Sequence, residues 1–344
     1  MYTRETVGFT EFVQGEQQLP ISGRLALARK AMEPARQSAE ADGEARIWAI
    51  RSSLRAAFYR SLAAQQQEVF LQGSLAEIRS VIELLATRER EGEGSRYDRI
   101  RVQRETADLE ADIAIARALA RGERALLLTY LPQATSIPRV AGEMETRNLT
   151  VGLDSVAEQA LNRRAEFRAQ QARLAQLSLE QQAADRQRIP EPSITAGLKR
   201  TQTGIGQLGA LQNGSGAAIG ISIPLPIFNK GQTEVARLSA EQDRIRAQRE
   251  VLSQQIRATV AGAHEVFVTR KDALAAFDEA TADSGDELLR TARLGFQEGE
   301  LGILQLLDAY RLKRQTSLRR LELQLAVKES EIELSRAAGF EVTQ

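Results

Sequence analysis

Hydrophobic and polar residues alternate from Ile219 to Leu225, with large aliphatic side chains on one face and glycine, serine and proline on the other. Alternation with a period of two is typical of a half-buried β-strand, because successive side chains of a strand point to opposite faces. Pro224 and Pro226 predict the end of this strand, since proline has no N–H to donate to a sheet. Asn229-Lys230-Gly231 predicts a turn, after which the apolar period becomes helical.

Two other segments predict strands of the same sheet. Ser193–Thr201 should pair with Ala217–Leu225 in an antiparallel hairpin, and Thr6–Gln14 is a weaker candidate. The intervening Gln202–Ser215 is rich in Gly, Gln and Asn, which predicts a flexible loop. Each hairpin strand would hold about nine residues, the length that a tilted strand needs to cross a bilayer. The residues expected to face lipid are Ile194, Ala196, Leu198, Ala217, Ile219, Ile221 and Ile223.

Helical periodicity covers most of the remaining chain. The predicted helices are 23–87, 96–129, 153–188, 231–294 and 303–338, with Asp154 as an N-cap and Gly339 as a C-cap. Leu238, Ile245 and Leu252 recur every seven residues, which is typical of a coiled-coil seam. A helix of about 60 residues would be roughly 90 Å long, which suits a rod or a tunnel wall better than an ordinary globular domain.

A duplication organises these elements. Leu19-Pro20-Ile21 matches Leu225-Pro226-Ile227, and farther along Glu91-Gly92-Glu93 matches Glu298-Gly299-Glu300. Matched strand ends and helix turns in the same order indicate a repeated strand–helix–turn–helix unit. We therefore divide the chain into a first repeat at 1–129, an equatorial linker at 130–152 and a second repeat at 153–344. The second repeat would contain a helix, a β-hairpin at 193–227 and a long helical hairpin at 231–338.

Composition excludes several kinds of function. Lysine plus arginine equals aspartate plus glutamate, at 46 each, so bulk charge gives no reason to expect nucleic acid as a partner. The chain has no cysteine and one histidine, His264, which excludes thiolate chemistry and His/Cys metal sites. Gly204–Gly216 is not followed by the Gly-Lys-Ser/Thr of a phosphate-binding loop. We expect no enzyme activity, no catalytic residue, and no cofactor or metal site.

Four stretches resemble the TolC-type outer-membrane efflux proteins, the outer-membrane factors of tripartite pumps. They are IGISIPLPIFNKGQ at 219–232, FQEGELGILQLLDAYR at 296–311, its copy EGEGSRYDRIRVQRE at 91–105, and residues 162–193. The resemblance covers essentially the whole chain and implies a mainly α fold with a small β part. Long antiparallel helical hairpins would form an α-barrel tunnel, and three subunits would contribute strands to a shared outer-membrane β-barrel. QQLPISGR at 17–24 also resembles the branch that exports heavy-metal cations.

The start of the chain departs from the family pattern. Family members begin with a signal peptide, a helical segment and a first strand, whereas MYTRETVGFTEFVQ has no charged and apolar leader. Three strands stand where the resemblance implies four, so we expect an N-terminal truncation. The implied location is the cell outer membrane, with an extension into the periplasm.

By the same resemblance, the two helix–helix turns form the periplasmic mouth of the tunnel. A periplasmic adaptor would dock at these turns and in the grooves between helix pairs. The turns are marked by Gly92, Gly94, Gly299 and Gly302.

The resemblance also implies a gate beside the turns. Three copies of Asp308 in a homotrimer would form an acidic, cation-selective ring, with Gln305 standing where the family often has a second acid. Asp98 would lie near Phe296, which stands where the family often has a tyrosine and cannot make the tyrosine's hydrogen bond. The alternative is that Asp98 and Asp308 belong to a solvated helix surface.

The sequence therefore predicts a homotrimeric outer-membrane channel, a passive conduit that exports small molecules or metal cations. Its partners would be a periplasmic adaptor, an inner-membrane pump and outer-membrane lipid. The rival hypothesis is a soluble periplasmic coiled-coil scaffold or adaptor without a pore. Such a scaffold would have no use for alternating strands of bilayer-spanning length, and an enzyme is a distant third.

Overall fold

The computed structural model describes residues 8–92, 94–136, 139–145, 148–149, 152–205, 210–282 and 284–343. The chain divides into two compact units, Met1–Asp42 with Glu166–Leu252, and Gly43–Ala165 with Ser253–Gln344. We call them the strand unit and the turn unit, because the first holds the three strands and the second holds both glycine turns. The fold is mainly helical with a small sheet, as the sequence predicts.

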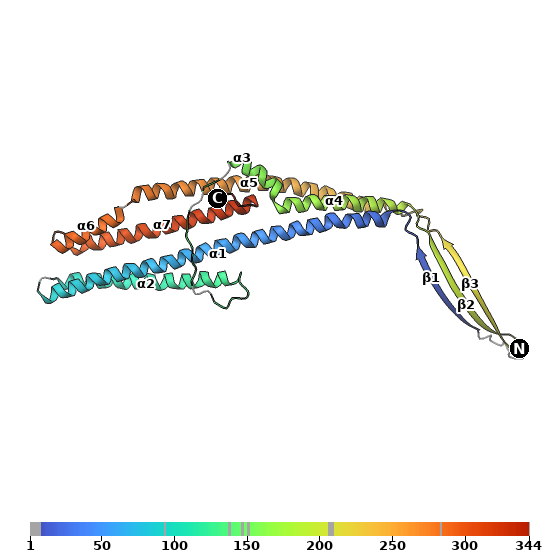
Figure 1. Ribbon diagram of the computed structural model, residues 1–344, viewed down its shortest axis with the longest axis horizontal. Helices are drawn as coiled ribbons and strands as arrows, with labels where there is room; N and C mark the ends of the chain where they lie inside the picture. Colours follow the sequence, from blue (N-terminus) through green and yellow to red (C-terminus); the bar gives the residue numbers. More distant parts are fainter. Residues whose placement is uncertain are drawn as a thin grey trace. The chain divides into compact units, whose positions relative to one another are not determined.

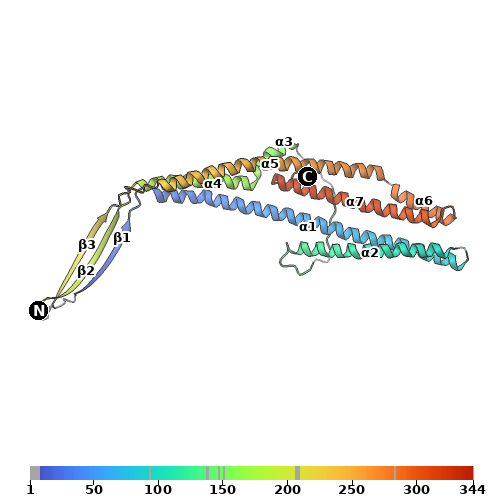
Figure 2. The same ribbon diagram turned by 180° about the vertical axis from the view of Figure 1, so that it is seen from behind.

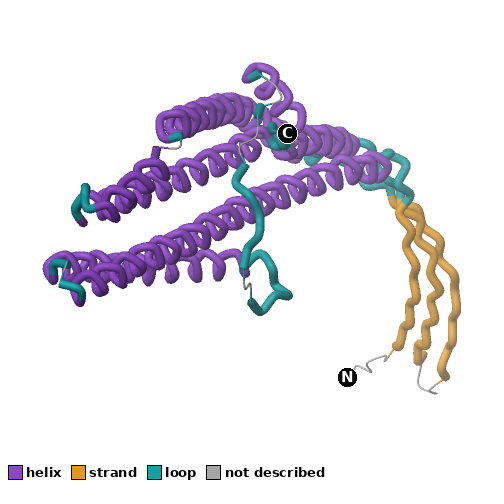
Figure 3. Tube along the Cα trace, turned by 60° about the vertical axis from the view of Figure 1, so that its left-hand side comes forward, coloured by secondary structure: helices purple, strands orange, loops and turns teal. Residues whose placement is uncertain are grey.

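The strand unit holds an antiparallel sheet with the strand order β1-β2-β3 (Figure 1; orange in Figure 3). The strands are β1 (Gly8–Gln18), β2 (Ser193–Ile205) and β3 (Ala210–Ser222). Within the described residues the three predicted strands are therefore confirmed, but β2 and β3 have 13 residues each and not about nine. In the register, Leu198 of β2 lies opposite both Val13 of β1 and Ala217 of β3.

The loop predicted at Gln202–Ser215 was wrong. Both of its ends belong to strands, and within it only residues 206–209 lie outside the described part of the chain. Gly, Gln and Asn have little strand preference of their own, but pairing with a neighbouring strand overrides that preference. Gln202 and Asn213, for example, lie opposite each other in the β2–β3 register.

The helices of the strand unit pack along the predicted seam. They are the first part of α1 (Arg24–Arg90), α4 (Ala165–Asp185), the short 3₁₀ helix η1 (Arg186–Arg188) and the first part of α5 (Gln232–Thr281). Leu238 and Ile245 of α5 form a buried cluster with Leu177 and Ala184 of α4. Two of the three positions in the heptad pattern therefore face a neighbouring helix.

The turn unit contains two helical hairpins. The rest of α1 lies alongside α2 (Arg96–Leu128), and α6 (Ser284–Glu298) lies alongside α7 (Ile303–Ala338), as both views show (Figures 1 and 2). The bounds of α7 are those that the sequence predicts. Gly339 ends α7 with a φ of 80°, so the predicted C-cap is confirmed.

Two helices that the sequence predicts as continuous are interrupted. The segment 153–188 forms α3 (Leu153–Arg163) and α4, separated at Arg164, whose backbone is extended. Arg164 Nη1 donates to the Ala337 carbonyl at 3.3 Å, a tertiary contact that local periodicity cannot reveal. The segment 231–294 forms α5 and α6, and α6 begins at Ser284-Gly285, two weak helix formers.

Asp154 is not the N-cap of α3. That position is held by Gly152, and Asp154 lies in the first turn of the helix. A carboxylate there still stabilises the helix, because it faces the positive end of the helix dipole.

The linker and the C-terminal residues meet in the turn unit. Leu149 forms an antiparallel bridge with Thr343, and Val140 packs near Leu62 of α1. Gln65 holds the Val140 backbone by donating to its carbonyl at 2.9 Å and accepting from its N–H at 3.0 Å. The division of the chain into two repeats and a linker remains a prediction. Within the described ranges, no helix is long and apolar enough to cross a membrane.

Candidate functional site

The turn between α1 and α2 requires glycine at two positions. Gly92 has a φ of 83°, a left-handed conformation that side chains other than glycine rarely adopt. A Cβ on Gly94 would lie 2.6 Å from the backbone nitrogen of Glu89, which is closer than real contacts allow. Ser95 then caps α2, because its hydroxyl accepts a hydrogen bond from the Tyr97 N–H at 3.2 Å.

The turn between α6 and α7 also contains a glycine in the left-handed conformation. Gly299 has a φ of 82°, and the Gly295 carbonyl accepts hydrogen bonds from the N–H groups of Glu300 at 2.8 Å and Leu301 at 3.0 Å. Gly302 occupies the N-cap position of α7. The two turns therefore share a left-handed glycine at positions that the sequence duplication matches.

Beneath the turns, the two hairpins share one apolar core. All four helices contribute buried side chains to it, and none of the hairpins could bury its apolar face alone. The core consists of Leu71, Ile78, Val81, Leu85, Val102, Leu109, Ile113, Ala116, Leu289, Ala292, Phe296, Ile303, Leu306, Leu307, Ala309 and Tyr310.

Arg88 of α1 ties the first hairpin to the end of α6. Its guanidinium donates to the carbonyls of Gln297 at 3.1 Å and Phe296 at 3.4 Å, and lies 5.1 Å from the centre of the Phe296 ring. The last carbonyls of a helix have no partner within the helix and carry partial negative charge, so a cation is stabilised there. Sequence analysis missed Arg88, since nothing local links it to residues 208 positions away.

Glu105 of α2 is buried and holds two arginines of α7. Both the Nε of Arg311, at 3.0 Å, and its Nη2 donate to Oε2, while Arg314 Nη2 donates to Oε1 at 3.3 Å. The hydrogen bonds from Arg311 lower the pKa of the Glu105 carboxyl, because they favour its ionised form, whereas burial opposes them. The same pairing raises the pKa of Arg311.

Glu105 was also not predicted from the sequence, although its position in the helical pattern could have indicated it. It lies on the buried stripe of α2 that includes Val102 and Leu109, three residues before it and four residues after it. An acid at a core position needs a charged partner, because an isolated buried carboxylate is costly. The apolar stripe could have predicted that Glu105 is buried and paired, but only the fold identifies Arg311 and Arg314 as its partners.

The predicted gate residues lie in three different environments. Phe296 is buried in the shared core, where its ring is covered by Arg88. Gln305 and Asp308 are exposed and stand three residues apart on one face of α7. Asp98 is half-buried in the first turn of α2. The structure thus groups Gln305 with Asp308, but it places Phe296 inside the core.

The residues predicted to face lipid are exposed, and all of them except Ile223, which follows the end of β3 at Ser222, share one face of the sheet. The exposed fractions are 39% for Ile194, 69% for Leu198, 83% for Ile219, 71% for Ile221 and 55% for Ile223. The register places the first four on the same side as Val13, which is 74% exposed. Contiguous exposed apolar side chains are typical of surfaces that contact a membrane or another protein.

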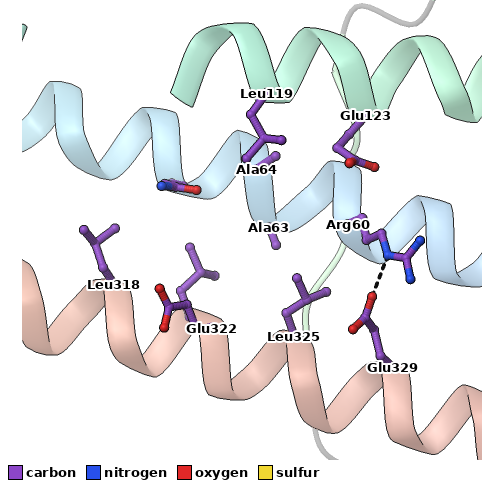
Figure 4. Close-up of a pocket in the computed structure, with 11 residues that line it drawn as sticks. Arg60, Ala63, Ala64, Leu119, Glu123, Leu318, Glu322, Leu325 and Glu329 are labelled. Carbon is purple, nitrogen blue, oxygen red and sulfur yellow. Dashed lines mark hydrogen bonds and ion pairs between the residues drawn. The ribbon is translucent and has the colours of Figure 1, made fainter. Parts of the chain in front are cut away.

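A groove lies between the first hairpin and α7 within the turn unit (Figure 4). Its cavity of about 260 Å³ has an apolar floor that includes Ala63, Leu119 and Leu325. Arg60 at the rim donates to Glu329 at 2.5 Å, which raises the pKa of Arg60. Glu123 and Glu322 also line the groove. In the described part of the chain, no cluster of three or more His, Cys, Asp or Glu side chains could hold a metal ion.

Comparison with known proteins agrees with this architecture. The family described as outer membrane efflux protein matches residues 156–340, more than half of the chain. The cobalt-zinc-cadmium resistance protein CzcC of Cupriavidus metallidurans is 23% identical over 312 residues, which cover 88% of this chain and 70% of CzcC.

Two solved structures share the fold at 18% sequence identity. CusC has a TM-score of 0.73, with 98% of this chain and 83% of CusC covered. The open state of the MtrE outer membrane channel of Neisseria gonorrhoeae also has a TM-score of 0.73, with 98% of this chain and 81% of MtrE covered.

Proposed function

The chain belongs to the outer membrane efflux protein family, and from this premise we propose that it is one subunit of a homotrimeric channel in a tripartite efflux system. The channel is a conduit across the outer membrane and does no chemistry on what passes through it. An inner-membrane pump supplies the driving force, and a periplasmic adaptor connects the pump to the channel.

The observation that carries this proposal is the apolar face of the sheet. Ile219, Ile221 and Leu198 are each more than two-thirds exposed, although burial of such side chains normally drives folding. Lipid facing the sheet would cover them, as in other barrels whose outer faces are apolar. A coiled-coil scaffold in water would leave this surface uncovered, so the rival hypothesis has no support from the sheet.

The exported substrate is proposed to include divalent metal cations. CzcC, whose name describes resistance to cobalt, zinc and cadmium, matches 88% of this chain. Carboxylates such as Asp308, repeated three times around a narrow pore, would attract cations by Coulomb forces. Gln305 on the same helix face is neutral, so the ring would have one acid per subunit at this level.

The contacts between the hairpins are proposed to hold the gate closed. Arg88 and Glu105 link the first hairpin to the second through charge-assisted hydrogen bonds, which are stronger than neutral ones. Separation of the hairpins would break these bonds and would expose part of the core near Phe296. The adaptor would offset that cost by docking at the glycine turns and in the groove lined by Leu119 and Leu325.

Planar-bilayer recording tests the proposed function. The purified chain, added to a lipid bilayer, should produce discrete ion-conducting steps, because three copies enclose a water-filled pore. A water-soluble coiled-coil scaffold would give no conductance and would remain in the aqueous phase. The absence of conductance from protein with intact helical circular dichroism would contradict the channel hypothesis.

A further inference from the structure

The apolar face of the sheet continues past the end of β3, within the strand unit. Ile223, Leu225, Ile227 and Phe228 are 55%, 69%, 67% and 90% exposed, although no strand pairing is left at these positions. Ile21, which follows the end of β1, is 66% exposed. The apolar surface therefore extends from the sheet down to the first turns of α1 and α5.

A cavity of about 230 Å³ opens at the foot of this apolar surface. Its lining combines Leu225 and Ile189 with the polar side chains of Arg24, Arg186 and Gln187. The cavity thus offers apolar and cationic side chains side by side. This arrangement matches a phospholipid, whose acyl chains and phosphate need different surroundings.

Among the described residues that line the cavity, Glu191 is the one acid, and its carboxylate already has hydrogen-bond and ion-pair partners within the chain. Glu191 accepts a hydrogen bond from the buried Ser22 hydroxyl and another from Gln18 Nε2 at 3.3 Å, and Arg24 Nη2 lies 3.6 Å from it. These contacts hold Arg24 at the edge of the cavity. They also offset the negative charge that would otherwise repel an anion.

Two further cations lie at or beside the cavity, where the strands meet the helices: Arg186 is part of the lining, and Lys230 precedes Gly231, which packs against Gln187 of the lining. Arg188 is paired with Asp185 at 3.0 Å, but Arg186 and the Lys230 ammonium make no ion pair with any described residue. Lys230 is held in place by its backbone, since its N–H donates to Gln232 Oε1 at 2.7 Å. Gln232 Nε2 in turn donates to the Phe228 carbonyl at 2.9 Å, which fixes the apolar and the cationic residue in one turn.

We propose that this junction is a binding site for an anionic phospholipid of the leaflet nearest the helices. Arg186, Lys230 and Arg24 would bind the phosphate, while Leu225 and Phe228 contact the acyl chains. The inference rests on the proposed function, because it takes the apolar face of the sheet to be the lipid-facing side. Basic residues beside an apolar surface favour anionic lipid by electrostatic attraction and by burial of their neighbours.

Native mass spectrometry of the full chain in neutral detergent tests the site directly. The probes are phosphatidylglycerol and phosphatidylcholine with identical acyl chains. The parent should retain phosphatidylglycerol preferentially, and the double variant Arg186→Gln/Lys230→Gln should lose that preference by about fivefold for each cation removed. The charge-preserving pair Arg186→Lys/Lys230→Arg should keep most of it.

The matched control is Arg46→Gln/Arg257→Gln, which removes two exposed cations that do not line the cavity. An equal loss of preference in this control would overturn the site, because only bulk charge would then matter. An unchanged preference in the Arg186→Gln/Lys230→Gln variant would overturn it as well.

A second measurement covers the case in which that variant does not fold. A photoreactive phosphatidylglycerol should label the parent at residues 18–24, 186–191 or 224–230, and labelling elsewhere would contradict the proposal. Both measurements are made in detergent and need no open pore. A chain that binds the lipid but gives no conductance would therefore refute the channel hypothesis and leave the lipid site intact. A chain that conducts ions but shows no preference for phosphatidylglycerol would refute the lipid site and leave the channel hypothesis intact.

Discussion

At the scale of single residues, the charged contacts between helices of the turn unit differ sharply in burial. Glu105 is 7% exposed and accepts hydrogen bonds from two arginines. The pair of Glu110 and Arg79 also joins two helices, at 2.7 Å, but both side chains are more than half exposed. Solvent screens the second pair, so we expect it to contribute at most about 1 kcal/mol.

Glu105→Gln should therefore weaken the closed gate. Arg311 and Arg314 would face a neutral acceptor in a partly buried site, which we expect to cost about 1–3 kcal/mol in the free energy of unfolding. Basal conductance in planar bilayers should rise. Glu110→Gln is the matched control and should leave both quantities nearly unchanged; equal effects of the two substitutions would contradict the gate role of Glu105.

The sign of the pH dependence follows from the lowered pKa of Glu105. A carboxyl with a lowered pKa stabilises the fold above its unfolded value, near 4.5, and loses that contribution as the pH falls through the folded value. Conductance of the parent should thus increase in this acidic range. Glu105→Gln should lack this component, because it has no proton to gain.

Asp308 gives a prediction about selectivity. Asp308→Asn should lower the preference for cations over anions, since a charge at a narrow constriction acts on every passing ion. The effect should shrink at 1 M salt, where the Debye length is about 3 Å. Asp272→Asn, an exposed acid on α5, is the control. If Asp308→Asn and the parent have equal reversal potentials at low salt, the alternative holds, in which Asp308 belongs to a solvated helix surface and not to the pore.

At the scale of elements, the proposed lipid-facing side of the sheet results from the alternation of side chains along each strand. Ile219 and Ala218 are neighbours in β3, yet the pleat directs their side chains to opposite faces. Ile219→Arg should cost about 2–4 kcal/mol if the residue lies near the bilayer midplane. Ala218→Arg is the control on the other face and should be tolerated better. Equal yields of both variants in the outer-membrane fraction would refute the assignment of the faces.

The helix turns owe their shape to glycine. Gly299→Ala should destabilise the hairpin by about 1–2 kcal/mol, because its φ of 82° is left-handed. Gly94→Ala should also destabilise it, since its Cβ would meet backbone. A Cβ on Gly122, six residues before the end of α2, would meet open space, so Gly122→Ala should be neutral or stabilising by up to about 1 kcal/mol. Thermal unfolding followed by circular dichroism ranks the three, and a Gly122→Ala variant as unstable as the other two would contradict this reasoning.

At the scale of the whole molecule, the sheet is incomplete by itself. β1 and β3 are edge strands of the described sheet, and exposed edges pair with other strands. Three strands cannot close into a barrel by themselves, so we expect the two edges to pair with strands of other copies.

Native mass spectrometry in mild detergent should accordingly give a complex of three chains. The same sample in guanidinium should give the 37.9 kDa monomer, which serves as the control for covalent association. A monomer or dimer in mild detergent would contradict the proposed assembly.

The sequence by itself determined the features that depend on neighbouring residues. Alternation at 219–225 predicted that a strand lies here, although β3 ends at Ser222 and not at Leu225. Glycine at 92 and 299 predicted the turns, and helical periodicity predicted the bounds of α7. These features follow from backbone sterics and from which side chains avoid water, and both are encoded within a few residues. The resemblance to a family rests on the same local stretches.

The tertiary structure decided what depends on residues far apart in the chain. Glu105 meets Arg311 across 206 positions, and Arg88 meets Gln297 across 209. The extended residue Arg164 interrupts a helix that periodicity made continuous, where its side chain donates to Ala337. Local pattern cannot supply such pairings, because a buried charge takes whichever partner the packing of helices brings within hydrogen-bonding distance.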